Sequence, residues 1–288
     1  MATLAVSRPD DDVLIGRRSA PFLKWAGGKR QLLPELLKEA PRTISTYYEP
    51  FVGGGALFFA LAARGRFRRA VLADCNQDLI DCYQAIKSDV KGVISALGGL
   101  AVGPDEFYEL RAQNPTELDP SRRAARTIYL NKVGFNGLYR VNSRGQFNVP
   151  YGRHNNPLVC DVPRLQAAAA ALKNVKLCCQ DFAKTVATAK PADFVYFDPP
   201  YVPVSATAYF TAYARSPFGP SEQGRLAQVL RQLRERKVPA LLSNSDCAAT
   251  RGLYDGLEMR SVDVRRAINS VATRRGSVKE ILVKSFSF

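Results

Sequence analysis

Short apolar runs alternate with segments of helical spacing along this chain, and that alternation predicts an α/β fold. Residues 193–197 are apolar and aromatic almost throughout, which is typical of a strand buried on both faces of a parallel sheet. Similar runs predict further strands at residues 70–74, 175–179, 240–245 and 281–283. Apolar spacings of three and four predict helices at residues 30–38, 56–63 and 76–87, and a helix capped by Ser221 that carries Leu226, Val229, Leu230 and Leu233.

The pattern changes between residues 90 and 173, where helical spacing dominates and basic residues are frequent. Two strand-like runs follow, at residues 138–142 and 146–150, with the turn Ser143-Arg144-Gly145 between them. Glycine suits a turn position of positive φ, so this stretch predicts a β-hairpin. Strand alternation puts Leu138, Arg140 and Asn142 on one face.

A two-stranded ribbon of this kind fits the major groove of DNA. The alternative is an exposed hairpin with solvated arginines. The charge of the chain favours the first interpretation. Its 288 residues carry 41 Lys and Arg against 26 Asp and Glu, a net charge of +15 that indicates a polyanionic partner, nucleic acid before a membrane surface.

Composition excludes several other classes of protein. No run approaches the roughly 18 apolar residues of a membrane span. The six cysteines form no CxxC pair, and His154 is the lone histidine, so we expect reduced thiols and no metal site. Residues 1–20 lack the apolar core of a signal peptide and are expected to be a disordered leader.

The candidate chemistry lies at the end of the strand at residues 193–197, in the sequence Asp198-Pro199-Pro200-Tyr201. Ligands of open α/β sheets bind at that end of the strands. The Asp198 carboxylate and the Pro199 carbonyl can each accept a hydrogen from an exocyclic amine, and Tyr201 can stack on an extruded base. The alternative is an ordinary strand-end turn with a solvated aspartate.

Other loops suit a nucleotide-like cofactor. Gly27-Gly28-Lys29 opens a helix and offers amide donors and a cation to a carboxylate. Residues 53–55 are three glycines between a strand and a helix. Asp74 ends the next strand, where such folds bind ribose hydroxyls, although it could instead cap the following helix. Asp181 and Phe182 follow another strand and can hold the edge and face of an adenine.

Together these blocks resemble the Dam-type, D12-class DNA adenine N6-methyltransferases over about residues 21–285. The resemblance rests on their order and spacing, and on residues 131–152, which are similar to the DNA-recognition hairpin of that family; its blocks here are Phe22-Leu23-Lys24-Trp25-Ala26-Gly27-Gly28-Lys29, Glu49-Pro50-Phe51-Val52-Gly53-Gly54-Gly55, Ala73-Asp74-Cys75-Asn76-Gln77-Asp78-Leu79-Ile80 and Asp198-Pro199-Pro200-Tyr201. It implies a Rossmann-like methyltransferase sheet at residues 21–89 and 174–288, with a mainly helical DNA-recognition insertion at residues 90–173.

The resemblance also implies S-adenosylmethionine as the cofactor and double-stranded DNA as the partner. We expect a cytoplasmic protein, either associated with a bacterial nucleoid or encoded by a phage. Implied cofactor contacts are Trp25 and Lys29 at its methionine end, the loop from Phe51 through Gly53 to Gly55 beneath it, Asp74 at its ribose, Asp181 and Phe182 at its adenine, and Asp198 at its amino group. Implied DNA contacts are Phe135 as a wedge, Asn136 at the backbone, Arg140 at the guanine of GATC, Arg144 at phosphate, and Leu138, Asn142 and Pro150 beside them.

Two departures from the family, Cys75 and the pair Glu222-Gln223, are expected to have little effect. Two rival functions stay open on the sequence: an N4-cytosine or RNA methyltransferase that uses the same loop on another amine, and a non-catalytic DNA-binding relative. The sequence does not distinguish a regulatory enzyme from the partner of a restriction nuclease.

Overall fold

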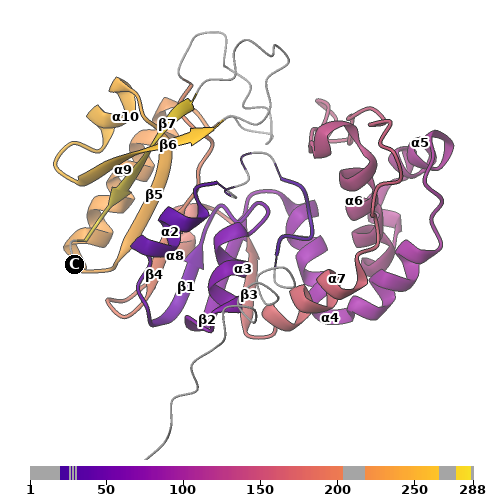
Figure 1. The fold of residues 1–288 in the computed structure, drawn as a ribbon, viewed down its shortest axis with the longest axis horizontal. Coiled ribbons are helices and arrows are strands. Elements are labelled where there is room, and N and C mark those ends of the chain that lie inside the picture. Colours follow the sequence, from indigo (N-terminus) through magenta and orange to yellow (C-terminus); the bar gives the residue numbers. More distant parts are fainter. Residues whose placement is uncertain are drawn as a thin grey trace, which may run out of the picture.

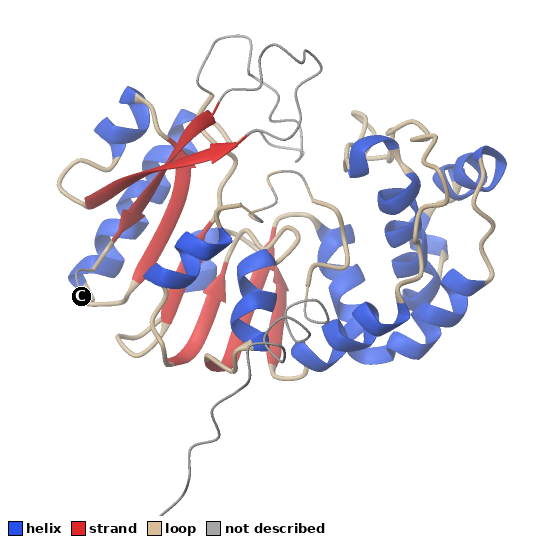
Figure 2. Cartoon of the chain, viewed as in Figure 1, coloured by secondary structure: helices blue, strands red, loops and turns tan. Residues whose placement is uncertain are grey.

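A mostly parallel sheet of seven strands forms the centre of the described structure (Figures 1 and 2). The structure is a computed structural model that describes residues 20–25, 27, 29, 31–203, 218–265 and 277–286. The strand order is β3-β2-β1-β4-β5-β7-β6. The strands are β1 (Ile44–Glu49), β2 (Phe67–Asp74), β3 (Val175–Cys179), β4 (Phe194–Phe197), β5 (Ala240–Ser245), β6 (Glu258–Arg265) and β7 (Ser277–Lys284).

The first five strands of that order pair in parallel, and β7 runs antiparallel between β5 and β6. The predicted α/β, Rossmann-like class is confirmed, and each strand predicted for the sheet has a counterpart. The sequence prediction missed β6, because this edge strand alternates charged and apolar residues instead of forming an apolar run. The expected leader at residues 1–20 lies outside the described residues except for Ala20.

The burial of strand β4 shows that the sheet is packed between two hydrophobic cores. All four of its residues are buried, and successive side chains point to opposite faces. Phe194 and Tyr196 pack into the hydrophobic core on one face, whereas Val195 and Phe197 pack into the core on the other. The continuous apolar run of the sequence is therefore the consequence of a strand that is covered on both sides.

Helices cover both faces of the sheet. One core includes residues of α2, α3, α4 and α7, and the other includes residues of α8, α9 and α10. The helices of the described residues are α2 (Leu33–Glu39), α3 (Ala56–Ala63), α4 (Gln77–Gly98), α5 (Pro104–Ala112), α6 (Pro120–Val133), α7 (Val162–Ala171), α8 (Phe182–Val186), α9 (Pro220–Glu235) and α10 (Ala248–Leu253).

The predicted cap of α9 is wrong. Gly219 occupies the N-cap position and Pro220 the first turn, so Ser221 already lies inside the helix. Proline at the first helical position has a favourable φ and needs no amide partner, which lets the helix begin before the serine.

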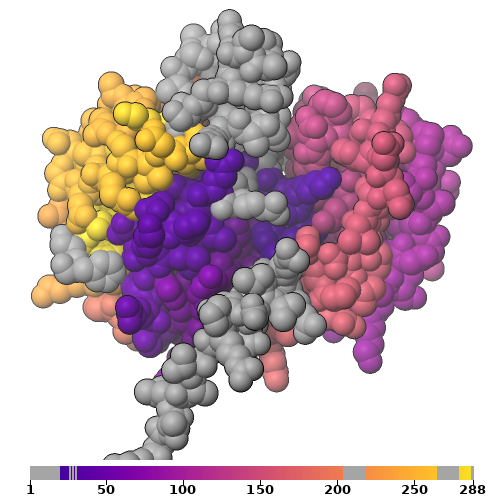
Figure 3. Space-filling model, viewed as in Figure 1, coloured from indigo at the N-terminus to yellow at the C-terminus, as the bar shows by residue number. Residues whose placement is uncertain are grey.

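Helices α4 to α7 pack on one another at the right of Figure 1, and α4 and α7 also contribute to the core on one face of the sheet. Helix α4 reaches this group through a kink at Asp89, whose backbone is not helical (φ −149°, ψ 64°). In the space-filling view the N-terminal residues, in indigo, lie between this group and the C-terminal strands and helices (Figure 3). The boundaries of the DNA-recognition insertion stay a prediction.

The predicted hairpin is present as a turn with little regular pairing. A single antiparallel bridge joins Val141 to Phe147, and the amide of Asn148 donates to the carbonyl of Arg140 over 2.9 Å. Gly145 has the expected positive φ, 77°. The expected strands at residues 138–142 and 146–150 do not form, because a two-stranded ribbon without a third strand is only marginally stable.

None of the helices in the described parts of the chain is long and apolar enough to cross a membrane.

Candidate active site

The predicted site residues meet at the carboxyl edge of the parallel strands. Strand β1 ends before the Phe51 to Gly55 loop, β2 ends at Asp74, and β4 ends before Asp198. The strand order reverses between β1 and β4, since β2 and β3 lie on one side and β5 on the other. Such a switch point is where ligands bind in open α/β sheets.

Asp198 is anchored through one of its two carboxylate oxygens. Its Oδ1 lies 2.8 Å from the Lys29 ammonium and accepts a hydrogen bond from the Ser243 hydroxyl over 3.2 Å. Ser243 in turn contacts the buried hydroxyl of Tyr196 at 2.8 Å. No described residue donates to Oδ2, so this oxygen is open to a ligand, and the alternative of an ordinary solvated aspartate is wrong.

Burial raises the pKa of Asp198, and the Lys29 ammonium opposes that shift. The side chain of Asp198 is 20% exposed and that of Lys29 only 8%, so little water screens the pair. Lys29 also donates to the Gly27 carbonyl over 2.9 Å and lies 4.4 Å from the ring centre of Tyr201. The ammonium thus holds the loop at Asp198, the glycine turn and the aromatic ring together.

Buried amides fix the backbone of the Asp198 loop. Gln223 donates to the Pro200 carbonyl over 2.7 Å and accepts a hydrogen bond of 3.1 Å from Asn244, while the Val202 amide donates to Asn244 over 2.9 Å. Gln223 and Asn244 are 4% and 0% exposed. We call these two residues the amide clamp, because they hold the chain on both sides of Tyr201.

Sequence reasoning missed the clamp, Ser243 and also Glu280, whose carboxylate accepts the Tyr201 hydroxyl over 2.7 Å. One signal was available: Ser243-Asn244-Ser245 is a polar triplet at the end of a buried strand, where apolar residues are expected. The Pro199 carbonyl accepts no hydrogen bond from the described residues, so it too is open.

The glycine loop that follows β1 is hydrogen-bonded to Asp74 at the end of β2. Asp74 accepts hydrogen bonds from the amides of Gly53 (3.1 Å) and Asn76 (3.0 Å). Asn76, rather than Asp74, caps α4, because its side chain accepts from the Leu79 amide over 3.1 Å. The helix-cap alternative for Asp74 is therefore wrong. Burial raises the pKa of Asp74, and the amide donors oppose that shift.

The glycines of this loop are needed for close packing. Gly53 and Gly55 have φ of 45° and 66°, a region that favours glycine. A Cβ atom on Gly53 would lie 2.7 Å from the Trp25 ring. Trp25 stacks on Tyr139 with ring centres 5.5 Å apart, so it connects the glycine loop to the hairpin.

The predicted adenine contacts lie together at the start of α8. The Asp181 carboxylate caps that helix, accepting from the Ala183 amide over 2.9 Å, and pairs with Arg225. Phe182 is buried against Phe51, with ring centres 5.5 Å apart, and the Arg225 guanidinium lies 4.3 Å from the Phe182 ring centre. Arg225 is thus a further residue of this corner that the sequence did not indicate.

The predicted DNA contacts lie at the turn after α6. Phe135 is 49% exposed, a rare state for a phenylalanine, and Asn136 has a φ of 54°. The Asn131 side chain donates to the carbonyls of Lys24 (2.6 Å) and Gly137 (3.0 Å) and accepts from the Lys24 amide (2.7 Å). It therefore fastens the Phe135 turn to the segment that carries Trp25.

Along the hairpin, Arg140 donates from Nε to the Asn148 side chain over 2.7 Å and from a terminal nitrogen to the Asn148 carbonyl over 3.0 Å. Its other terminal nitrogen is free of described partners. Asn142 shapes the turn by accepting the Arg144 amide over 3.0 Å, and the Pro150 carbonyl accepts the Phe135 amide over 2.9 Å. Leu138 is half-buried between these residues.

Among the described residues, no group of His, Cys, Asp and Glu side chains is arranged to hold a metal ion.

Known proteins with similar sequences were compared with this chain. The family model of the D12 class N6 adenine-specific DNA methyltransferase matches residues 25–268. The chain is 39% identical over 285 residues to the Type II methyltransferase M.MjaIII of Methanocaldococcus jannaschii, a match that covers 92% of this chain and 99% of that protein. It is also 39% identical to the Type II methyltransferase M1.LlaDCHI of Lactococcus lactis and to the DNA adenine methylase of Escherichia coli K12, each match covering 92% of this chain and 95% of the relative.

The amide clamp gives a prediction about stability. Gln223→Ala removes the hydrogen-bond partner of the Pro200 carbonyl and the acceptor for Asn244 Nδ2, and should lower the free energy of unfolding by about 1–3 kcal/mol in urea titrations. Gln228→Ala, at an exposed position of the same helix, is the control and should change it by less than about 0.5 kcal/mol. Equal effects of the two substitutions would show that the clamp contributes nothing.

Proposed function

The chain belongs to the D12 class N6 adenine-specific DNA methyltransferases, and from that membership we propose that it uses S-adenosylmethionine and modifies the adenine of GATC in duplex DNA. The observation that carries this proposal is a pair of acceptors, Asp198 Oδ2 and the Pro199 carbonyl, that take no hydrogen bond from the described residues. One oxygen of Asp198 is held by Lys29 and Ser243, which fixes the direction of the other.

Two acceptors are what the chemistry of an exocyclic amine requires. The lone pair of adenine N6 is delocalised into the ring, so the amine is a poor nucleophile. If Asp198 Oδ2 accepts one amine hydrogen and the Pro199 carbonyl accepts the other, the nitrogen becomes pyramidal and its lone pair is localised. The amide clamp keeps the loop in this geometry before the base arrives, so little reorganisation is needed in the transition state.

The residues at the carboxyl edge fit the proposed cofactor. The absence of a side chain at residue 53 lets Trp25 lie directly against the glycine loop, which places this ring beside the proposed cofactor loop. The half-buried Asp74 carboxylate suits a ribose diol. Trp25, Lys29 and Asp198 would hold the methionine end of the cofactor, whose sulfonium supplies the methyl group. Phe51, Gly53 and Gly55 would lie beneath it, and Asp181 and Phe182 would hold its adenine.

The DNA side of the proposal rests on Phe135 and the hairpin. An exposed ring on a turn that Asn131 fastens beside Trp25 can enter the duplex and support extrusion of the target base. Asn136, Asn142, Arg144 and Pro150 would contact the backbone, and Leu138 and Arg140 the bases. A guanidinium braced by Asn148 still has donors for guanine O6 and N7, the commonest specific contact in the major groove.

The ion pair predicts a pH dependence. Transfer needs ionised Asp198, so the rate falls as the pH falls through its pKa, which burial raises. Lys29→Met removes the charge that opposes this rise. The acid limb of the single-turnover rate at saturating cofactor should therefore move to higher pH. Lys38→Met, an exposed control that pairs with Glu35, should leave the limb in place. An unshifted limb in Lys29→Met would contradict the assigned electrostatics.

Sequence choice is tested at the hairpin. Arg140→Ala should cost about 1–3 kcal/mol in transition-state binding on GATC duplexes and should reduce discrimination at the guanine. Arg144→Ala should weaken binding to all duplexes about equally, as loss of a phosphate contact does. The measurement is methyl transfer to GATC duplexes and to duplexes with one substituted base. Equal losses on every duplex with Arg140→Ala would make it a backbone contact and remove the physical support for GATC.

A further inference from the structure

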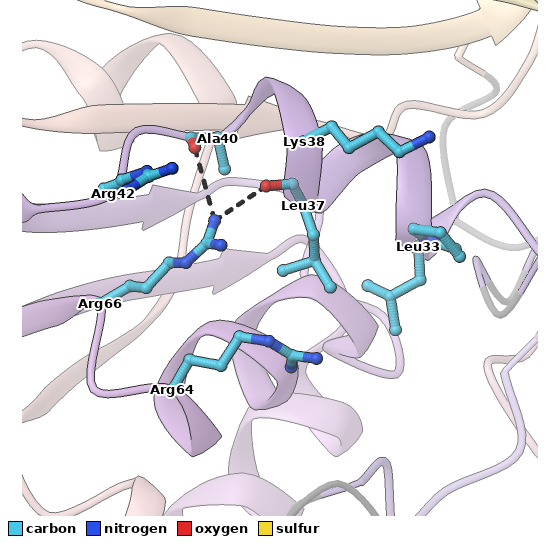
Figure 4. Close-up of a pocket in the computed structure, with 8 residues that line it drawn as sticks. Leu33, Leu37, Lys38, Ala40, Arg42, Arg64 and Arg66 are labelled. Carbon is cyan, nitrogen blue, oxygen red and sulfur yellow. Dashed lines mark hydrogen bonds between the residues drawn. The ribbon is translucent and has the colours of Figure 1, made fainter. Parts of the chain in front are cut away.

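A group of cationic side chains surrounds a pocket that the proposed reaction does not use. The pocket has a volume of about 510 Å³ and is lined by two kinds of residue, the cations Lys38, Arg42, Arg64 and Arg66 and the uncharged Leu33, Pro34, Leu37 and Ala40 (Figure 4). Its cations come from the end of α2 and from the turns before β1 and β2.

The pocket lies at the other edge of the sheet from Asp198. Arg42 and Arg66 precede β1 and β2, whereas the cofactor loops follow the carboxyl ends of the same strands. Strand β1 has six residues, so the two edges are roughly 20 Å apart. A ligand held in the pocket would therefore not overlap the methyl-transfer site.

Most of the positive charge in this pocket has no acidic partner among the residues that the structure describes. No salt bridge joins Arg42, Arg64 or Arg66 to an acidic residue in the described parts of the chain, and only Lys38 is paired, with Glu35 at 2.7 Å. Burial lowers the pKa of Arg66, and the charges of Arg64 and Arg42 lower it further. Like charges held close together repel one another, so a bound anion would stabilise this group.

Two of the guanidinium groups are held in place. Arg66 donates from one nitrogen to the carbonyls of Leu37 (2.8 Å) and Ala40 (3.4 Å), and Arg64 donates to the Ala60 carbonyl over 2.9 Å. These bonds satisfy backbone carbonyl groups at the carboxyl ends of α2 and α3, so Arg66 has a structural role. They use one terminal nitrogen on each side chain, so the remaining donors of Arg64 and all those of Arg42 have no hydrogen-bond partner among the described residues.

We propose that this pocket binds a nucleotide through its phosphates. Guanidinium groups match the geometry and charge of phosphate oxygens better than ammonium groups do, and two of the three here are held by hydrogen bonds. In Figure 4 the side chains of Leu33 and Leu37 line the space next to Arg64, so they offer an apolar wall to a sugar and base. The volume is within the usual range of small-molecule sites. A free nucleoside polyphosphate or a nucleotide of a DNA strand would supply this chemistry.

The test is calorimetric titration of the full chain with UTP and with inorganic triphosphate at low salt. Saturating S-adenosylhomocysteine is added to block the cofactor site, and UTP avoids adenine recognition there. We expect UTP to bind more tightly than triphosphate, because only UTP has a sugar and a base that can pack against Leu33 and Leu37. The double variant Arg42→Gln with Arg64→Gln should bind UTP at least about tenfold more weakly, since two charge-assisted contacts are lost. Arg66 is kept because it closes α2.

The matched control is Arg68→Gln with Arg69→Gln, which removes the same charge from exposed positions of β2 that do not line the pocket. It should retain UTP binding. The proposal is overturned if the wild type does not bind UTP, or if the two double variants lose UTP affinity equally. Displacement of UTP by a duplex that lacks GATC would identify a DNA strand as the source of the nucleotide, and no displacement would identify the free nucleotide. Both double variants should keep full methyl transfer, which separates this result from any failure of the proposed function.

Discussion

The ion pair between Lys29 and Asp198 is the interaction on which the rest of the site depends. It joins a glycine turn near the N-terminus to the loop after β4, two segments that nothing else in the described site connects so closely. Burial alone would favour a neutral Asp198, and a neutral carboxyl group is a poor acceptor for an amine. The ammonium opposes that tendency and occupies only one of the two oxygens. The other oxygen takes no hydrogen bond from the described residues and is therefore left available to a ligand.

The position of this ion pair follows from the packing of β4. Its four buried side chains fill two cores, one on each face of the sheet, so the strand cannot shift by one residue without exchanging those sets. The amide clamp then fixes the loop beyond the strand, since Gln223 comes from α9 and Asn244 from β5. The packing of β4 and the amide clamp together thus determine the directions of Asp198 Oδ2 and the Pro199 carbonyl.

Local sequence was sufficient to predict the elements whose burial is simple. The sequence predicted β4 and β5 from their apolar runs. It also predicted the glycine loop at Gly53 and the position of Asp198 at the end of a strand. The edge strand β6 was missed because half of its residues face solvent. The clamp was missed for another reason: Gln223 and Asn244 are distant in sequence and meet Pro200 only through the packing of α9 on β5. Arg225 at Asp181 is a contact of the same kind. The hairpin fell short of regular strands because pairing depends on neighbours that local sequence does not specify.

The most direct test of the account is the product formed on DNA by the wild type and by Asp198→Asn. The protein is incubated with labelled S-adenosylmethionine and GATC-containing plasmid, and the DNA is digested to nucleosides. Wild type should yield labelled N6-methyldeoxyadenosine. The asparagine variant has almost the same shape but lacks the charge and presents an amide in place of one oxygen, so it should form almost no product while keeping the wild-type fold. Methylated cytosine as the product, or near wild-type turnover by Asp198→Asn, would contradict the account.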